Sequence, residues 1–182
     1  MGSDKTALQL EGESLAARAA ETLARAVGEV VIADRGRRLV PTWPSVEDGP
    51  GRGPAAGLLG VAQRFPGRPL LALACDLPLV PASLLVDLAG REGFDWAVVE
   101  SAQGLEPLCA LYGPAALAAL TRRVETGRFA LHELAEEAGL SVFTLEGEAL
   151  RRHGEPERLL LNVNTPEDWE RLGQALAGVD LP

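Results

Sequence analysis

Hydrophobic positions along this chain follow two periods, one typical of helices and one typical of buried strands. Apolar residues recur every three or four positions in segments that we predict as helices: 14–27, 54–64, 81–89, 115–124 and 130–138. Short, continuously apolar or β-branched runs predict strands: 29–33, 69–75, 96–100, 108–112, 141–145 and 159–161. A last helix is predicted to begin at Thr165-Pro166-Glu167-Asp168, because Thr caps a helix and Pro fits its first turn.

Strands that alternate with helices predict an α/β fold in which helices cover a mostly parallel sheet. The run from Pro69 to Cys75 is apolar throughout, so we expect it to be a central strand. The chain has 182 residues, which is near the usual size of one domain and is enough to bury a core without a disulfide or a metal. We therefore expect a single domain over residues 1–182.

Composition excludes several classes of protein. The net charge of −9 and the pI of about 4.8 argue against nucleic acid or an anionic membrane as a partner, because both attract a positive surface. No apolar run approaches the ~18 residues of a membrane span, and the start of the chain lacks a secretory pattern, so we expect a cytoplasmic protein. Cys75 and Cys109 are expected to be reduced core thiols, and His132 and His153 to be solvated surface residues.

Candidate chemistry lies where predicted strands end, since ligands of such sheets gather at the carboxyl ends of the strands. Asp76 directly follows an apolar strand and is suited to bind a hard cation or to cap the next turn. The glycine-rich run 51–57 enters a helix and lets backbone N–H groups approach a ligand. Asp48, just before that run, is either a hydrogen-bonding group for a base or sugar or a plain turn residue.

Two residue types that are rare in this chain, lysine and asparagine, each occur in one short segment. Lys5 is the only lysine among the 17 basic residues, and the only asparagines are Asn162 and Asn164. If the segment around Val163 is extended, both amides lie on one face, where they can orient phosphate or metal-bound water. A turn before the last helix is the alternative interpretation of the two asparagines.

The order of these segments resembles that of the molybdenum cofactor guanylyltransferases. Met1-Gly2-Ser3-Asp4-Lys5 is similar to the end of the family's glycine-rich motif, and Asp48 with Gly53-Pro54-Ala55-Ala56-Gly57 resembles an Asp followed by Gly-Pro-Leu-Ala-Gly. Cys75-Asp76-Leu77-Pro78 resembles Cys-Asp-x-Pro, and the segment 162–168 resembles the family's Asn-Val-Asn-Thr-Pro. Glu106-Pro107-Leu108 is similar to a Pro-Leu strand entry, so the resemblance covers nearly the whole chain.

This resemblance implies an enzyme that transfers GMP from GTP to molybdopterin with Mg²⁺, on a three-layer Rossmann-like nucleotidyltransferase sheet. Lys5 would contact the GTP phosphates, Asp48 the guanosine, and Asp76 both the metal and the nucleotide, with Lys5 and Asp76 as the catalytic pair. Gly53 and Gly57 would shape the nucleotide pocket. Asn162 and Asn164 would lie beside the metal and the second substrate, and other proteins of the cofactor pathway are possible partners.

Two departures from the family accompany the resemblance. The first strand and glycine-rich loop of the family are missing from this chain, so we expect the strands at Val30–Ala33 and Pro69–Ala74 to face a gap, with residues upstream of Met1 completing the sheet. We expect such residues to raise the melting temperature and to permit GTP binding, and the 182-residue form by itself to bind GTP weakly or not at all. A poorly stable fragment is the alternative interpretation. In addition, Ala33-Asp34 stands where relatives often carry Asn, which places one nucleotide contact in question.

Other functions remain open at this point. The cytidylyltransferase of the same pathway is similar at the start and at the Asp-x-Pro, but it typically has an Asp-rich counterpart of the Asn-Val-Asn segment and lacks Gly-Pro-x-Ala-Gly. Another sugar or cofactor nucleotidyltransferase is a further alternative. A degenerate relative that binds a pterin or a partner protein without catalysis is favoured by the missing loop and opposed by Lys5, Asp76 and the two asparagines.

Overall fold

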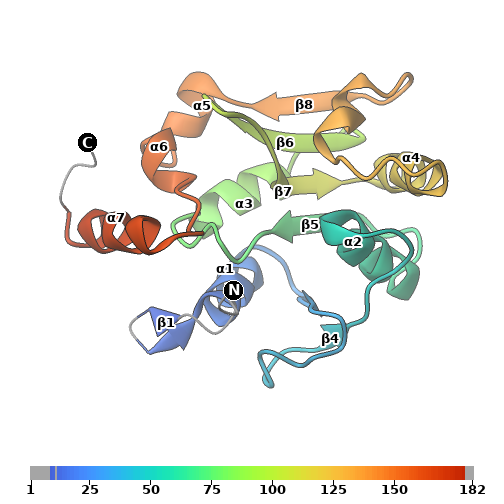
Figure 1. The fold of residues 1–182 in the computed structure, drawn as a ribbon. Coiled ribbons are helices and arrows are strands. Elements are labelled where there is room, and N and C mark those ends of the chain that lie inside the picture. The colour runs from blue at the N-terminus through green and yellow to red at the C-terminus, as the bar shows by residue number, and fades with distance from the viewer. Residues whose placement is uncertain (1–8, 11, 179–182) are drawn as a thin grey trace.

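A computed structural model describes residues 9–10 and 12–178 of the chain. Its main sheet has four strands in the order β5-β7-β6-β8 (Figure 1), with the bounds β5 Leu70–Leu73, β6 Trp96–Ser101, β7 Gly104–Tyr112 and β8 Val142–Leu145. β7 runs antiparallel to both β5 and β6, whereas β6 and β8 are parallel. Three strands therefore run in one direction and β7 runs against them.

Two smaller pairings lie earlier in the chain. β3 (Ile32–Ala33) is parallel to β4 (Ser45–Val46), and β1 (Gln9–Leu10) is antiparallel to β2 (Glu13–Ser14). The helices of the described chain are α1 Leu15–Ala26, α2 Gly53–Arg64, α3 Ala82–Ala89, α4 Pro114–Glu125, α5 Gly147–Arg151, α6 Pro156–Leu159 and α7 Pro166–Leu176, with a 3₁₀ helix η2 at His132–Glu136.

The main sheet separates two hydrophobic layers, because successive side chains of a strand point to opposite faces. Trp96 and Val98 of β6 pack in one cluster with residues of α2 and α4. Ala97 and Val99 pack in a second cluster with residues of α3 and α5. Helices thus cover both faces, which confirms the predicted three-layer α/β architecture.

Some predicted elements differ from the structure. The segment 159–161, predicted as a strand, ends helix α6 and continues as irregular chain, because a short apolar run buries equally well as a helical turn. The predicted helix 130–138 is the shorter η2, and the strand 29–33 is reduced to β3. β5, expected in the centre, lies at the end of the main sheet among the described residues.

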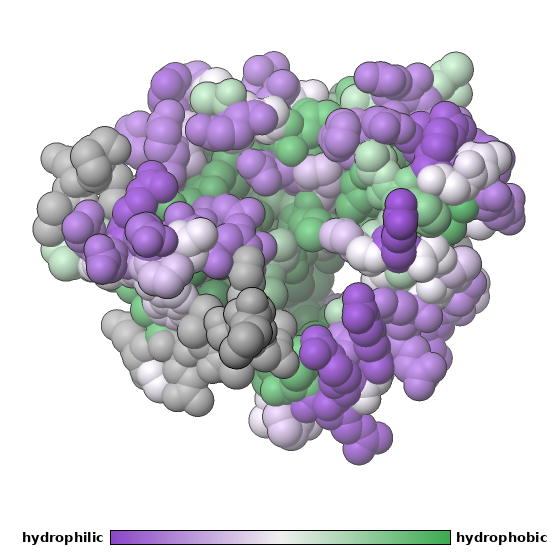
Figure 2. Space-filling view, in the orientation of Figure 1, coloured by the Kyte–Doolittle hydropathy of each residue, from purple (hydrophilic) through white to green (hydrophobic). Residues whose placement is uncertain are grey.

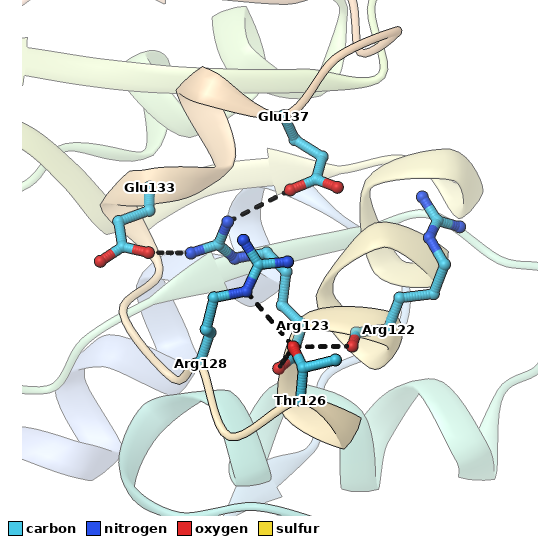
Figure 3. A network of polar contacts seen from close by, with 6 residues as sticks. All are labelled: Arg122, Arg123, Thr126, Arg128, Glu133 and Glu137. Carbon is cyan, nitrogen blue, oxygen red and sulfur yellow. Dashed lines mark hydrogen bonds and ion pairs between the residues drawn. The ribbon is translucent and has the colours of Figure 1, made fainter.

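A buried arginine explains where η2 sits. Arg123 of α4 has a side chain only 3% exposed and forms ion pairs with Glu133 and, at 3.2 Å, with Glu137 (Figure 3). Removing a partner from a buried charge typically costs about 3–5 kcal/mol. The two carboxylates therefore tie the 3₁₀ segment to α4 and stabilise its position against the sheet.

The structure also bears on the predictions for the cysteines, the histidines and membrane-spanning segments. Cys75 and Cys109 are both free thiols, and Cys109 is fully buried, whereas Cys75 is half-buried. His132 is exposed as expected, but the His153 side chain is only 12% exposed, because it contacts Ser83 and Asp87 of α3. Among residues 9–10 and 12–178, no helix is long and apolar enough to cross a membrane.

Candidate functional site

A cavity of about 880 Å³ opens between β3 and β5. Residues 29–34 line one side of it and residues 69–76 the other, while α1 and α2 contribute the remaining walls. Figure 2 shows the molecule hollowed at its centre, with hydrophobic side chains inside the hollow. Within the described chain the two strands therefore face a gap, as the sequence predicted. We refer to this cavity as the central groove.

Polar residues line the central groove just after its strands end. Asp34 follows β3, Asp48 follows β4, and Asp76 follows β5 after two residues, and all three line the groove. The structure thus brings Asp48 and Asp76, which the sequence singled out separately, to one cavity. This is the arrangement expected for a ligand site in an α/β sheet.

The charge of Asp76 affects its neighbours. Burial raises the pKa of the Cys75 thiol, and the adjacent Asp76 carboxylate raises it further. Burial also raises the pKa of Glu106, where a hydrogen bond from Ser101 acts in the opposite direction and the charge of Asp76 adds to the rise. The carboxylate of Asp76 therefore adds to the effect of burial and opposes the ionisation of both neighbouring groups.

The asparagine segment is attached directly to Asp76. The backbone N–H of Val163 donates to the carbonyl of Asp76 at 2.8 Å, and the Val163 side chain is fully buried. Asn162 and Asn164 flank it, are exposed, and hydrogen-bond each other through their side-chain amides. The two amides therefore lie on one side of the segment, as predicted, next to the backbone of Asp76.

A capping box holds the asparagine segment in place. The Thr165 hydroxyl accepts from the Asp168 N–H at 3.2 Å, and the Asp168 carboxylate accepts from the Thr165 N–H at 2.8 Å. The same carboxylate accepts from the N–H of Asn164 at 2.9 Å. The predicted start of the last helix is confirmed, and its cap fixes the backbone on which Asn164 stands.

Glycine contacts determine where Asp48 lies. The N–H of Gly49 donates to the carbonyl of Ala56 at 2.8 Å, so the segment before α2 folds back onto the helix. A Cβ on Gly60 would lie 2.1 Å from the carbonyl oxygen of Glu47. Gly49 and Gly60 were not among the predicted site residues, although their position on either side of the glycine-rich run 51–57 is visible in the sequence. This close approach is possible only because position 60 has no side chain.

The predicted pocket glycines lie at the start of α2. Gly53 has φ of +61°, a conformation that favours glycine, and Gly57 faces Ala33 and the Asp48 carboxylate. A Cβ on Gly57 would lie 3.3 Å from the Ala33 Cβ and 3.9 Å from Asp48 Oδ1. Gly57 therefore lets α2 lie close to Ala33, with Asp48 Oδ1 beside the same turn of the helix.

The turn after β3 contains two residues whose roles the sequence did not reveal. Asp34 is only 4% exposed, and its carboxylate accepts hydrogen bonds from the N–H of Leu39 and the hydroxyl of Ser45. It therefore holds the loop between β3 and β4. Arg35 forms an ion pair with Asp48, and the Arg35 Nε lies 3.1 Å from Asp48 Oδ2.

The remaining predicted groups are a lysine and a metal. Lys5 lies outside the described residues. In residues 9–10 and 12–178, no group of three or more His, Cys, Asp or Glu side chains is arranged to hold a metal ion. Asp76 offers a carboxylate at the groove rim, which suits a cation such as Mg²⁺ that takes one or two protein carboxylates and completes its shell with substrate phosphates.

Comparison with known proteins decides the family. Residues 1–140 match the model of the MobA-like NTP transferase domain. The chain belongs to this family. It is 34% identical to the probable molybdenum cofactor guanylyltransferase of Opitutus terrae over 184 aligned residues, which cover 94% of this chain and 87% of that protein. It is 30% identical to the corresponding protein of Natronomonas pharaonis, with 96% and 90% of the two chains covered.

A solved structure supports the fold assignment of this family member. The molybdopterin-guanine dinucleotide biosynthesis protein A of Archaeoglobus fulgidus superposes with a TM-score of 0.77 at 24% identity, covering 98% of this chain and 93% of the other. At that identity the likeness shows the fold. The family and the curated relatives together show that the chain is a nucleotidyltransferase.

Proposed function

We propose that this protein transfers GMP from GTP to molybdopterin and releases pyrophosphate. An oxygen of the acceptor forms a bond to the α-phosphorus of GTP, and the bond from that phosphorus to the bridging oxygen of pyrophosphate breaks. The names of the relatives support this choice of substrates. The structural observation that carries it is the hydrogen bond from the Val163 N–H to the Asp76 carbonyl, because it attaches the asparagine segment to the backbone of a residue that lines the groove.

The proposed roles divide the central groove by chemistry. Asp48 accepts hydrogen bonds from the guanine or the ribose, while Gly53 and Gly57 admit the nucleotide to the start of α2. Lys5 would neutralise the triphosphate, together with the free N–H groups of the helix start. Phosphoryl-group transfer needs mainly positioned reactants and neutralised charge, so few catalytic side chains suffice.

The second substrate would bind on the other side of Asp76. Asn162 and Asn164 are exposed there, and each amide can donate to a phosphate and accept from a hydroxyl or a metal-bound water. Their mutual hydrogen bond holds both amides in one orientation. In this arrangement molybdopterin, the acceptor, binds on the side of Asn162 and Asn164, and GTP binds on the side of Gly53 and Gly57.

Asp76 is the residue that we propose to hold Mg²⁺. A bound Mg²⁺ would neutralise the negative charge that develops on the transferring phosphate. Burial is the main cause of the raised pKa values of Cys75 and Glu106, and the charge of the Asp76 carboxylate adds to both, which supports a negative group at this position. The single domain, the cytoplasmic location and the association with other proteins of the cofactor pathway remain predictions from the sequence.

The test is calorimetry of GTP binding with and without Mg²⁺, together with pyrophosphate release in the presence of molybdopterin. Asp76→Ala is expected to reduce metal-dependent binding and turnover about a hundredfold or more while the fold is retained. Glu21→Ala, which removes an exposed acid from α1, is the control and should match the unmodified chain. Unchanged affinity for Mg²⁺ and GTP in Asp76→Ala, or a preference for CTP, would contradict the proposal.

A further inference from the structure

The loop between β3 and β4 brings Arg35 to the central groove. Arg35 directly follows the buried Asp34, and it is one of the residues that line the groove. Its backbone has φ of +62°, a conformation that residues other than glycine rarely adopt. Strained backbone of this kind persists only where the surrounding structure holds it, and it is most frequent at binding sites.

The hydrogen bonds of Asp34 hold this strained turn. Its carboxylate accepts from the N–H of Leu39 at 2.7 Å and from the hydroxyl of Ser45. Its carbonyl accepts from the backbone N–H of Arg37 at 3.3 Å and from the Arg37 Nε at 3.0 Å. The turn is therefore fixed through both the side chain and the backbone of Asp34, so Arg35 extends from a well-held position.

The same turn packs beside the chain that carries Asp48. The N–H of Gly36 donates to the carbonyl of Val46 at 3.4 Å. A Cβ on Gly36 would lie 3.1 Å from the Cγ of Glu47, so the turn and the end of β4 are in close contact. These contacts, together with the ion pair of Arg35 with Asp48, place the two side chains next to each other.

The ion pair leaves donors and acceptors available to a ligand. The Arg35 Nε contacts Asp48, whereas the N–H groups on the Nη atoms of Arg35 form no hydrogen bond with any residue that the structure describes. The Arg35 side chain is 70% exposed and that of Asp48 is 26% exposed, so both are accessible. Each carboxylate oxygen can accept more than one hydrogen bond. The pair therefore presents Oδ1, Oδ2 and then a group of N–H donors.

Guanine carries the complementary groups in the same order along one edge. Its 2-amine and its N1–H are donors, and O6 beside them is an acceptor. A carboxylate matches the two donors, and a guanidinium matches O6, which is the atom that arginine most often recognises on guanine in nucleic acids. Adenine has an amine in place of O6. It would therefore set a donor against the donors of Arg35, and such a mismatch costs binding free energy.

We propose, on the basis of the GTP binding proposed above, that Arg35 is a specificity-determining residue that donates hydrogen bonds to O6 of guanine. Asp48 accepts from the 2-amine and from N1–H, and the Nη groups of Arg35 continue the same row to O6. The ion pair thus acts as one recognition unit, in which the aspartate reads the donors of the base and the arginine reads its acceptor.

Two analogues of GTP separate the contacts of the two residues. 6-Thio-GTP keeps N1–H and the 2-amine but replaces O6 with sulfur, a weak acceptor, whereas inosine triphosphate keeps O6 and lacks the amine. Calorimetry with Mg²⁺ gives the ratios of the dissociation constants, which can be compared whatever the absolute affinity. We expect the unmodified chain to prefer GTP over 6-thio-GTP roughly tenfold, the scale of one hydrogen bond to a charged group. Arg35→Ala should bind these two nucleotides equally and keep its preference for GTP over inosine triphosphate.

Arg38→Ala is the matched control. It removes the same charge from the same loop, at a residue with φ of +54° that is not among those lining the groove. We expect Arg38→Ala to keep both preferences and to have the same melting temperature as Arg35→Ala.

The outcomes separate this inference from the proposed function. If Arg35→Ala still prefers GTP over 6-thio-GTP, or loses the preference over inosine triphosphate instead, Arg35 only orients Asp48, and the inference is wrong although the chain binds GTP. Equal binding of GTP and 6-thio-GTP by the unmodified chain would overturn it as well. If the unmodified chain binds none of the three nucleotides, the proposed function is itself contradicted.

Discussion

The Nε of Arg35 lies 3.1 Å from Oδ2 of Asp48, and this contact orients the carboxylate at the groove. Asp48 Oδ1 lies on the side of Gly57 instead, 3.9 Å from the position that a Cβ would take there. One oxygen is thus engaged by the guanidinium, and the other is directed toward the start of α2. An acceptor held beside a donor in this way is suited to a heterocycle whose edge carries both donors and acceptors, as guanine does.

Asp48→Asn tests whether the carboxylate recognises the base. A carboxylate accepts from both the ring N–H and the exocyclic amine of guanine, whereas an amide presents a donor to one of them. We expect the KM for GTP to rise roughly tenfold to a hundredfold, and the preference for GTP over inosine triphosphate, which lacks the amine, to disappear. Steady-state kinetics with both nucleotides measures this ratio.

Deoxy-GTP and Arg35→Ala complete that experiment. If Asp48 contacts the ribose instead, the variant will lose its preference for GTP over 2′-deoxy-GTP and keep its preference over inosine triphosphate. Arg35→Ala leaves the carboxylate in place and should therefore raise KM less than Asp48→Asn does. If the Asp48→Asn enzyme retains both nucleotide preferences, Asp48 does not recognise the nucleotide and its role is structural.

Asn164→Asp places a carboxylate where phosphate is expected to bind. The Asn162 amide can turn to donate to the new carboxylate, so we expect the melting temperature to change little. Transfer from GTP should fall about a hundredfold because like charges repel. Gln174→Glu, the same chemical change on the exposed face of α7, is the matched control. If Asn164→Asp and the control transfer GMP equally well, the asparagine segment only forms the turn before α7 and does not act in the reaction.

Gly60→Ala is expected to displace the backbone that carries Asp48. The added Cβ would meet the Glu47 carbonyl at 2.1 Å and the Gly49 nitrogen at 2.8 Å, so the loop must move. Overpacking of this kind typically costs about 1–3 kcal/mol, which denaturant unfolding measures. Gly173→Ala on α7 meets nothing within 4 Å and should stabilise the protein by up to about 1 kcal/mol. If the two variants have the same free energy of unfolding, the loop that carries Asp48 can move without destabilising the protein.

Asp168 is expected to make the protein less stable in acid. The hydrogen bond from the Asn164 N–H, followed by those from Thr165, holds the pKa of Asp168 below 3.8 in the folded state. A depressed folded-state pKa adds stability above the unfolded value, and that stability is lost as the pH falls through the folded one. The Tm difference between the unmodified chain and Asp168→Asn should therefore be largest above pH ~4 and shrink in acid.

The carboxyl titration of Asp168 provides the direct check. Two-dimensional NMR of the side-chain carboxyl should give a pKa below that of an exposed acid such as Glu170 by more than their intrinsic difference. A Tm difference that stays constant from neutral pH into acid would mean that the Asp168 carboxylate does not stabilise the cap.

Sequence alone determined the features of this protein that depend on neighbours in the chain. The helical periods of α1 and α2, the cap at Thr165 and the side-by-side amides of Asn162 and Asn164 follow from local spacing and from hydrogen bonds over a few residues. The order of the motifs likewise indicated the family and the gap between two apolar strands. Local geometry limits these elements to few alternatives, which is why they could be predicted.

Tertiary structure decided the features that depend on residues far apart. The reversed direction of β7 and the position of β5 at the end of the sheet follow from pairing between distant strands, which an apolar run does not encode. The burial of Asp34 and its hydrogen bond from Ser45, and the contact of Arg35 with Asp48, join residues more than ten positions apart. A charged residue in a turn is expected to be exposed. Asp34 is buried instead, because the folded chain supplies hydrogen-bond partners that no local sequence pattern reveals.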